Sequence, residues 1–100
     1  MTDEPLTTRT DPEILEVLGA RMRALRKAVG LTLVQAAERT GLDRSTISEF
    51  EHGGNATLLT LARLLRAYGR LSALESFIPE PEVSPMALLR DRSRKGGYGG

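Results

Sequence analysis

Residues 31–53 constrain the fold of this chain most strongly, because two short helical patterns meet there at a single glycine. Thr32 and Gln35 match a capping box, in which the threonine hydroxyl accepts from a free N–H of the first turn while the glutamine side chain reaches back. Gly41 follows one helix length later, and glycine adopts positive φ without a steric penalty. We therefore predict a helix that ends at Gly41, where the chain turns sharply.

A second helix is predicted at residues 44–52, with Asp43 as its cap. Ile47 and Phe50 are spaced three apart and define one apolar face. The other side chains are polar: Arg44, Ser45, Thr46, Ser48 and Glu49. A short helix with so few apolar anchors presents a polar face to a partner.

This stretch resembles the helix-turn-helix of the phage-repressor-like (Cro/C1, XRE-type) family of DNA-binding proteins, over roughly residues 20–78. The resemblance implies an all-α, five-helix lambda-repressor-like domain whose second motif helix enters the DNA major groove. It places three residues at base-reading positions: Arg44, Ser45 and Glu49. It also implies a partly buried structural ion pair between Arg26 and Glu51.

The implied contacts to the DNA backbone involve Thr32, Leu33, Thr46, Ser48, His52 and Asn55. Leu33 replaces a glutamine common in the family, so phosphate contact there must come from backbone N–H groups at the helix start. Glu49 replaces a basic or amide residue, and it either accepts from cytosine N4 or points away from the base. His52 has a second interpretation as a cation favoured by the helix dipole.

Three further helices complete the predicted domain at residues 11–78, which follows a flexible N-terminal arm at residues 1–10. Asp11 is the predicted cap of the first helix, and Pro12 is its first residue. An apolar stripe continues along this helix until Gly30 ends it. The stripe contains Ile14, Leu15, Leu18, Met22, Leu25 and Val29. Thr57 caps a helix whose apolar stripe contains Leu58, Leu61, Leu64, Leu65 and Tyr68.

Ser72 and Glu75 match a second capping box that opens the fifth helix. Its apolar residues are numerous for so short an element: Leu71, Leu74, Phe77 and Ile78. The family resemblance makes them a homodimer interface, and the alternative is that they only close the core of the monomer. The C-terminal extension at residues 79–100 opens with two prolines and is predicted to be partly disordered, with a short helix from Ser84 through Met86, Leu88 and Leu89.

Composition limits the class of protein. The chain has 100 residues, no cysteine and one histidine, which predicts one domain with no disulfide, metal site or cofactor. An enzyme is excluded, since no catalytic constellation or phosphate loop is present. A polar start and the lack of a long apolar run predict a cytoplasmic protein with no membrane contact. The net charge of +1 supports nucleic-acid binding weakly, although arginines cluster locally.

Together these patterns predict a dimeric regulator, most simply a repressor, that binds a palindromic operator in double-stranded DNA through residues 44–52. The alternative function is an antitoxin that binds a protein toxin through residues 79–100 and regulates its own operon. The apolar residues that follow the prolines motivate this alternative.

Overall fold

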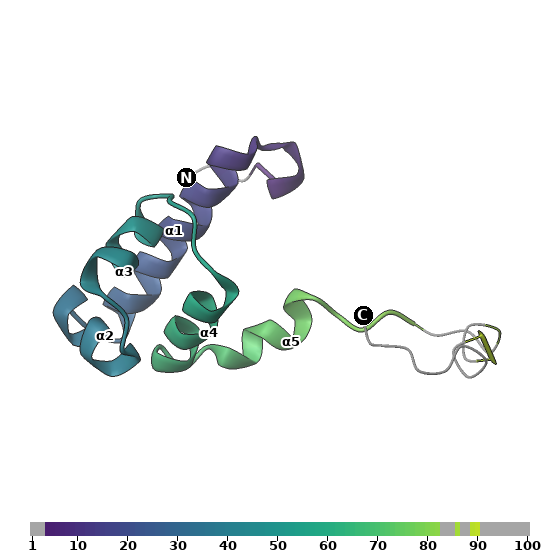
Figure 1. The fold of residues 1–100 in the computed structure, drawn as a ribbon. Coiled ribbons are helices and arrows are strands. Elements are labelled where there is room, and N and C mark those ends of the chain that lie inside the picture. The colour runs from purple at the N-terminus through teal and green to yellow at the C-terminus, as the bar shows by residue number, and fades with distance from the viewer. Residues whose placement is uncertain (1–3, 83–85, 87–88, 91–100) are drawn as a thin grey trace.

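The computed structural model describes residues 4–82, 86 and 89–90, and all regular structure within these residues is helical. The elements are η1 (Leu6–Thr8), α1 (Asp11–Ala28), α2 (Leu33–Thr40), α3 (Arg44–Glu51), α4 (Leu58–Ala67), η2 (Leu71–Ala73) and α5 (Leu74–Phe77), where η marks a 3-10 helix. α3 packs along α1, α2 packs on α3 and α4, and α5 follows η2 away from the other helices (Figure 1). The predicted all-α fold with five helices is confirmed.

The α2–turn–α3 segment forms as its sequence predicts. Thr32 Oγ1 accepts from the Gln35 N–H at 3.1 Å, and the Thr32 N–H donates to the glutamine side chain at 2.9 Å. Gly41 has φ of 76° and ends α2 in the left-handed conformation. Asp43 is the N-cap residue of α3, as predicted, although its side chain makes no capping hydrogen bond.

Two other predicted helix starts are wrong. α1 is capped by Thr10, whose hydroxyl accepts from the Glu13 N–H while Glu13 reaches back, so Asp11 is already helical. Ser72 does not open a capping box, because it lies inside η2 and the chain runs directly into α5. A capping box needs an extended residue before the helix, whereas the cap position of α5 is in the helical region.

The core is formed by one face from each of α1 to α4. Its buried apolar residues are Met22, Leu31, Ala36, Ile47, Phe50, Leu64, Leu65 and Tyr68. Ile47 and Leu64 are fully buried, and each burial of this kind contributes about 1.5–3 kcal/mol. Leu58 is 71% exposed, so it does not belong to the apolar stripe predicted for α4. It stands in the first turn of that helix, beyond the reach of the core.

The two ends of the described chain are less regular. Within the predicted arm at residues 1–10, the Thr8 hydroxyl donates to a backbone carbonyl of the η1 turn at 2.9 Å. Residues 79–82 have no regular structure, as the two prolines predict. The helix predicted at residues 84–89 and the basic segment after it lie outside the described residues, apart from residues 86, 89 and 90.

A buried ion pair joins α1 to the end of α3. Arg26 Nε donates to Glu51 Oε2 at 2.7 Å, and its Nη2 donates to Oε1 at 2.9 Å. Arg26 Nη1 donates to the Leu31 carbonyl at 2.9 Å, in the link between α1 and α2. The hydrogen bonds to Glu51 raise the pKa of Arg26 despite its burial. This is the pair that the family resemblance implies.

Tyr68 of the α4 terminus is buried with these charges in the same core. Its hydroxyl has no hydrogen-bond partner among the described residues. Burial raises the pKa of Tyr68 to about 12, and the nearby Glu51 carboxylate adds to the shift. Tyr68 therefore stays neutral, and the Arg26 guanidinium is balanced by one carboxylate.

The backbones of α1 and α3 are in direct contact at Gly19. A Cβ atom at this position would lie 2.3 Å from the Phe50 carbonyl oxygen and 2.8 Å from that of Glu51. Both distances are far inside van der Waals contact. α1 therefore accommodates the C-terminal turn of α3 only because residue 19 has no side chain.

We predict that Arg26→Met lowers the free energy of unfolding by about 3–5 kcal/mol, because it leaves the Glu51 carboxylate buried without a partner. The double variant Arg26→Met/Glu51→Leu should recover most of this loss, but not all, since the Leu31 carbonyl still lacks its donor. Urea unfolding measures the free energy of unfolding of both variants. Arg23→Met, at an exposed position of the same helix, is the matched control and should change little. Equal losses for the two single variants would contradict the assigned role of the pair.

Candidate nucleic-acid interface

α3 has a buried side and an exposed side. Ile47, Phe50 and Glu51 face the core. The three residues predicted to read bases, Arg44, Ser45 and Glu49, are all exposed, and helical periodicity places Ser45 and Glu49 opposite the buried side. Thr46 and Ser48 are half-buried at the edges. The exposed side therefore offers a guanidinium, a hydroxyl and a carboxylate on one rigid helix.

A hollow of about 480 Å³ lies where the N-terminal ends of α2 and α3 meet. It is lined by Leu33, Asp43, Arg44, Ser45 and Ser48. The structure thus brings one predicted backbone-contacting residue of α2 next to two predicted base-reading residues of α3. Asp43 also belongs to this group, which its type and position did not indicate, since they suggested only a helix cap.

A second hollow of about 430 Å³ lies at the other end of α3 and is lined by Glu49, His52, Gly54 and Asn55. The Gly54 N–H donates to the Glu49 carbonyl at 2.7 Å, which folds the loop back against the helix. A Cβ atom on Gly54 would lie 2.9 Å from that carbonyl oxygen, so the loop approaches α3 closely. Asn55 and His52, both exposed, line the same hollow at this end.

His52 Nδ1 lies 2.7 Å from the Ser48 carbonyl oxygen. With the proton assigned to Nδ1, the ring donates to the Ser48 carbonyl, which also accepts from the His52 backbone N–H at 3.1 Å. Nε2 is then on the far side of the ring and can contact another group. Both interpretations of His52, the phosphate contact and the cation at the helix end, stay predictions.

The predicted backbone-contacting residues differ in how their side chains are used. The hydroxyl and the backbone N–H of Thr32 are both engaged with Gln35, so the predicted phosphate contact at the start of α2 falls to the backbone N–H of Leu33. Asn55 is exposed in the loop. The predicted dimer residues of η2 and α5 lie apart from this surface, beyond α4 (Figure 1).

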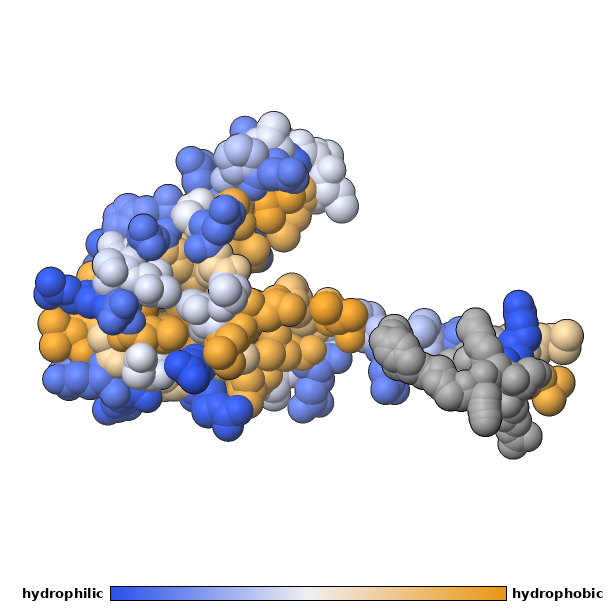
Figure 2. All heavy atoms as spheres, viewed as in Figure 1, coloured by the Kyte–Doolittle hydropathy of each residue, from blue (hydrophilic) through white to orange (hydrophobic). Residues whose placement is uncertain are grey.

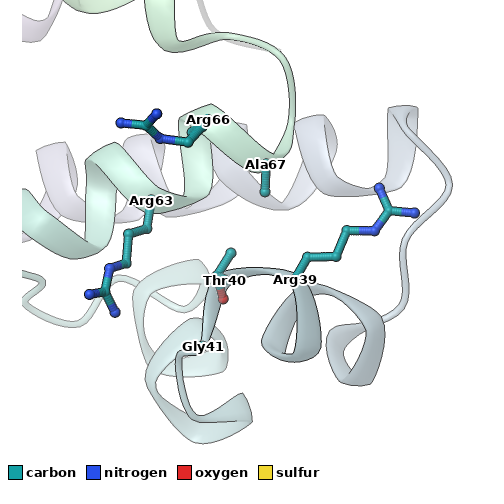
Figure 3. A pocket seen from close by; sticks show the side chains of 6 residues that line it. All are labelled: Arg39, Thr40, Gly41, Arg63, Arg66 and Ala67. Atoms are coloured by element: carbon teal, nitrogen blue, oxygen red, sulfur yellow. The ribbon is translucent and has the colours of Figure 1, made fainter.

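A third hollow, of about 730 Å³, lies between the α2–α3 turn and α4, and is rimmed by Arg39, Arg63 and Arg66. Figure 3 shows that the three guanidinium groups point in different directions, with Arg39 directed away from the two arginines of α4. They do not converge on a common point. This surface is basic, but it is not built to hold one small anion.

A family model described as helix-turn-helix, HTH_3, matches residues 22–75, which is more than half of the chain. The chain belongs to this helix-turn-helix family. The match starts inside α1 and ends inside α5, so it contains the whole α2–turn–α3 motif. The predicted Cro/C1-type resemblance is therefore confirmed.

Membership of this helix-turn-helix family establishes a DNA-binding domain of the kind that transcriptional regulators contain, and the family is not enzymatic. Within the part of the chain that the structure describes, no helix combines the length and the apolar character needed to cross a bilayer.

Proposed function

We propose that this helix-turn-helix protein is a dimeric repressor that binds a palindromic operator through the exposed side of α3. The observation that supports this most directly is the division of α3, whose buried side is fixed by Ile47, Phe50 and the Arg26–Glu51 pair while its polar side is free. A B-DNA major groove accepts one α-helix of this kind. Bound there, the protein would block access of RNA polymerase.

Base recognition is assigned to Arg44, Ser45 and Glu49. The Arg44 guanidinium can donate two hydrogen bonds to guanine O6 and N7, and Glu49 can accept from cytosine N4. Backbone contacts come from the start of α2 and from both ends of α3. At the far end, the exposed Asn55 amide can donate to a phosphate oxygen, and the exposed His52 ring can do so through Nε2 when both of its nitrogens carry a proton. These contacts fix the helix in the groove.

We expect Arg44→Ala to weaken binding to the preferred operator by about 1–3 kcal/mol and to relax preference at one base pair. Asn55→Ala is the matched comparison, because it removes a phosphate donor and should weaken all sequences alike. Fluorescence anisotropy with operator and random duplexes at fixed salt measures both. An equal loss on the two duplexes for Arg44→Ala would refute its role in base recognition.

Dimerisation is assigned to the apolar surface of η2 and α5, formed by Leu71, Leu74, Phe77 and Ile78. Phe77 is 54% exposed and Ile78 is 74% exposed, although both are large and apolar. Leu74 and Phe77 also line an apolar cavity of about 280 Å³, whose other walls come mainly from α1, α3 and α4. Figure 2 shows hydrophobic atoms gathered over α4 and α5. A second copy would cover this surface, because exposed apolar patches mark association sites.

A two-fold axis through α5 would present two α3 helices to successive major grooves, about 34 Å apart. Each half of a palindromic operator would then meet the same side chains. This arrangement explains why a helix of only eight residues suffices, since two weak half-site contacts combine into one specific complex.

We predict that Phe77→Ser converts the protein to a monomer at micromolar concentration, as measured by sedimentation equilibrium. Affinity for the palindromic operator should fall at least tenfold, whereas affinity for an isolated half-site should not change. Val29→Ser, at another exposed apolar position, is the control and should leave the dimer intact. A native chain that is monomeric in the presence and absence of operator would overturn the assignment.

An antitoxin role is the second candidate. Met86 and Leu89 are exposed apolar residues that follow the proline-interrupted residues 79–82. Such residues suit a segment that folds on binding a protein partner. The partner would be a toxin encoded beside this gene.

Deletion of residues 79–100 separates the two candidate functions. We expect the truncated chain to bind and repress its operator as the full chain does. If the protein is also an antitoxin, the full chain should co-purify with the co-expressed product of the neighbouring gene, and the truncated chain should not. Gel shift and co-purification of full and truncated chains measure this. Co-purification that is equally strong without residues 79–100, or absent for both chains, would exclude toxin binding through this segment.

A further inference from the structure

Leu33 is an apolar residue in an otherwise polar surface. It is the first residue of α2, and it lines the hollow between α2 and α3 together with Asp43, Arg44, Ser45 and Ser48. Each of those four side chains has a hydrogen-bonding group, and Leu33 has none. Leu33 is half-buried and packs with part of its surface against the core. The rest of the side chain is open to the hollow.

The chemistry of this hollow limits what Leu33 can contact. Its side chain can neither donate to a phosphate nor hydrogen-bond to a base edge, and the adjacent Thr32 hydroxyl is engaged within the capping box. An apolar side chain gains free energy only by excluding water from another apolar group. In the DNA major groove, that group is the C5-methyl of thymine.

From this we infer that Leu33 reads the methyl group of a thymine in the operator, at a base pair next to the one contacted by Arg44. The inference rests on the proposed insertion of α3 in the major groove. It gives α2 a part in sequence specificity, beyond the backbone N–H contact to phosphate at its N-terminus. Arg44 and Leu33 then read neighbouring base pairs from opposite walls of one hollow.

The adjacent residue provides an internal comparison. Val34 is also apolar and exposed, but it does not line the hollow. If the thymine preference comes from contact in the hollow, it should depend on Leu33 and not on Val34.

The test replaces thymine by uracil, which removes one methyl group from the DNA and leaves the protein unchanged. Operator sites are first selected from random duplexes, and each thymine is then replaced singly. Loss of one buried methyl group corresponds to about a fourfold weaker Kd. We expect this loss at one thymine in each half-site for the native chain and for Val34→Ala. For Leu33→Ala, replacing the same thymine by uracil should leave the Kd unchanged.

Comparing the variant and the base change in one double-mutant cycle isolates the contact from any effect of Leu33 on folding. Leu33→Met conserves apolar volume and should retain the uracil sensitivity, which provides a second variant should Leu33→Ala fold poorly. Selected half-sites without thymine, uracil tolerated at every position, or equal uracil sensitivity in native and Leu33→Ala chains would each overturn the inference. Failure to select any preferred sequence would instead overturn the proposed operator binding.

Discussion

The bidentate ion pair between Arg26 and Glu51 holds together the parts of this protein that lie far apart in sequence. One guanidinium contacts the last turn of α3 and the link that leads into α2, so both helices of the motif are fixed to α1 by one side chain. Buried ion pairs of this kind contribute little net stability compared with apolar residues of the same size. What the pair provides is a unique geometry, because two carboxylate oxygens and a backbone carbonyl must meet three donors at once. The orientation of α3 relative to α1 follows from that requirement.

Stability and recognition are separated on α3 by its helical period. A helix of eight residues is not stable alone in water, so α3 depends on the packing of its inner side. Ile47 and Phe50 supply this packing. The outer side is therefore under no packing constraint, and it can present charged groups without a desolvation cost in the free protein. A surface of this kind suits a ligand that brings its own charge, as DNA does.

The features predictable from sequence are those determined within a few residues. The capping box of Thr32, the Gly41 turn and the Thr57 cap of α4 all form as predicted, because each hydrogen bond joins residues close in sequence. The two-sided character of α3 also follows from its period. Thr10 and Asp11 are both residue types that cap helices, and Thr10 became the cap of α1 because the Glu13 side chain accepts from its backbone N–H. Residue type alone therefore does not decide which of two adjacent residues caps a helix.

The features that sequence could not supply depend on how helices approach one another. The exposure of Leu58 follows from where α4 meets the core, and the grouping of Leu33 with Asp43 and Arg44 follows from the angle between α2 and α3. The exposure of Arg44, Ser45 and Glu49 was therefore predictable from the period of α3, whereas the residues that lie beside them were not. The same holds for Gly19, whose role appears only when α3 is packed against α1.

The absence of a side chain at Gly19 has a consequence for substitutions in α1 and α3. The close approach of α3 to α1 requires that residue 19 has no side chain, and this residue is buried, away from the exposed side of α3. Substitutions on the exposed side of α3 leave this contact between the two helices unchanged. A methyl group added at residue 19 would clash with two backbone carbonyl oxygens of α3, so the helix would have to shift as a whole and its exposed side chains would move with it.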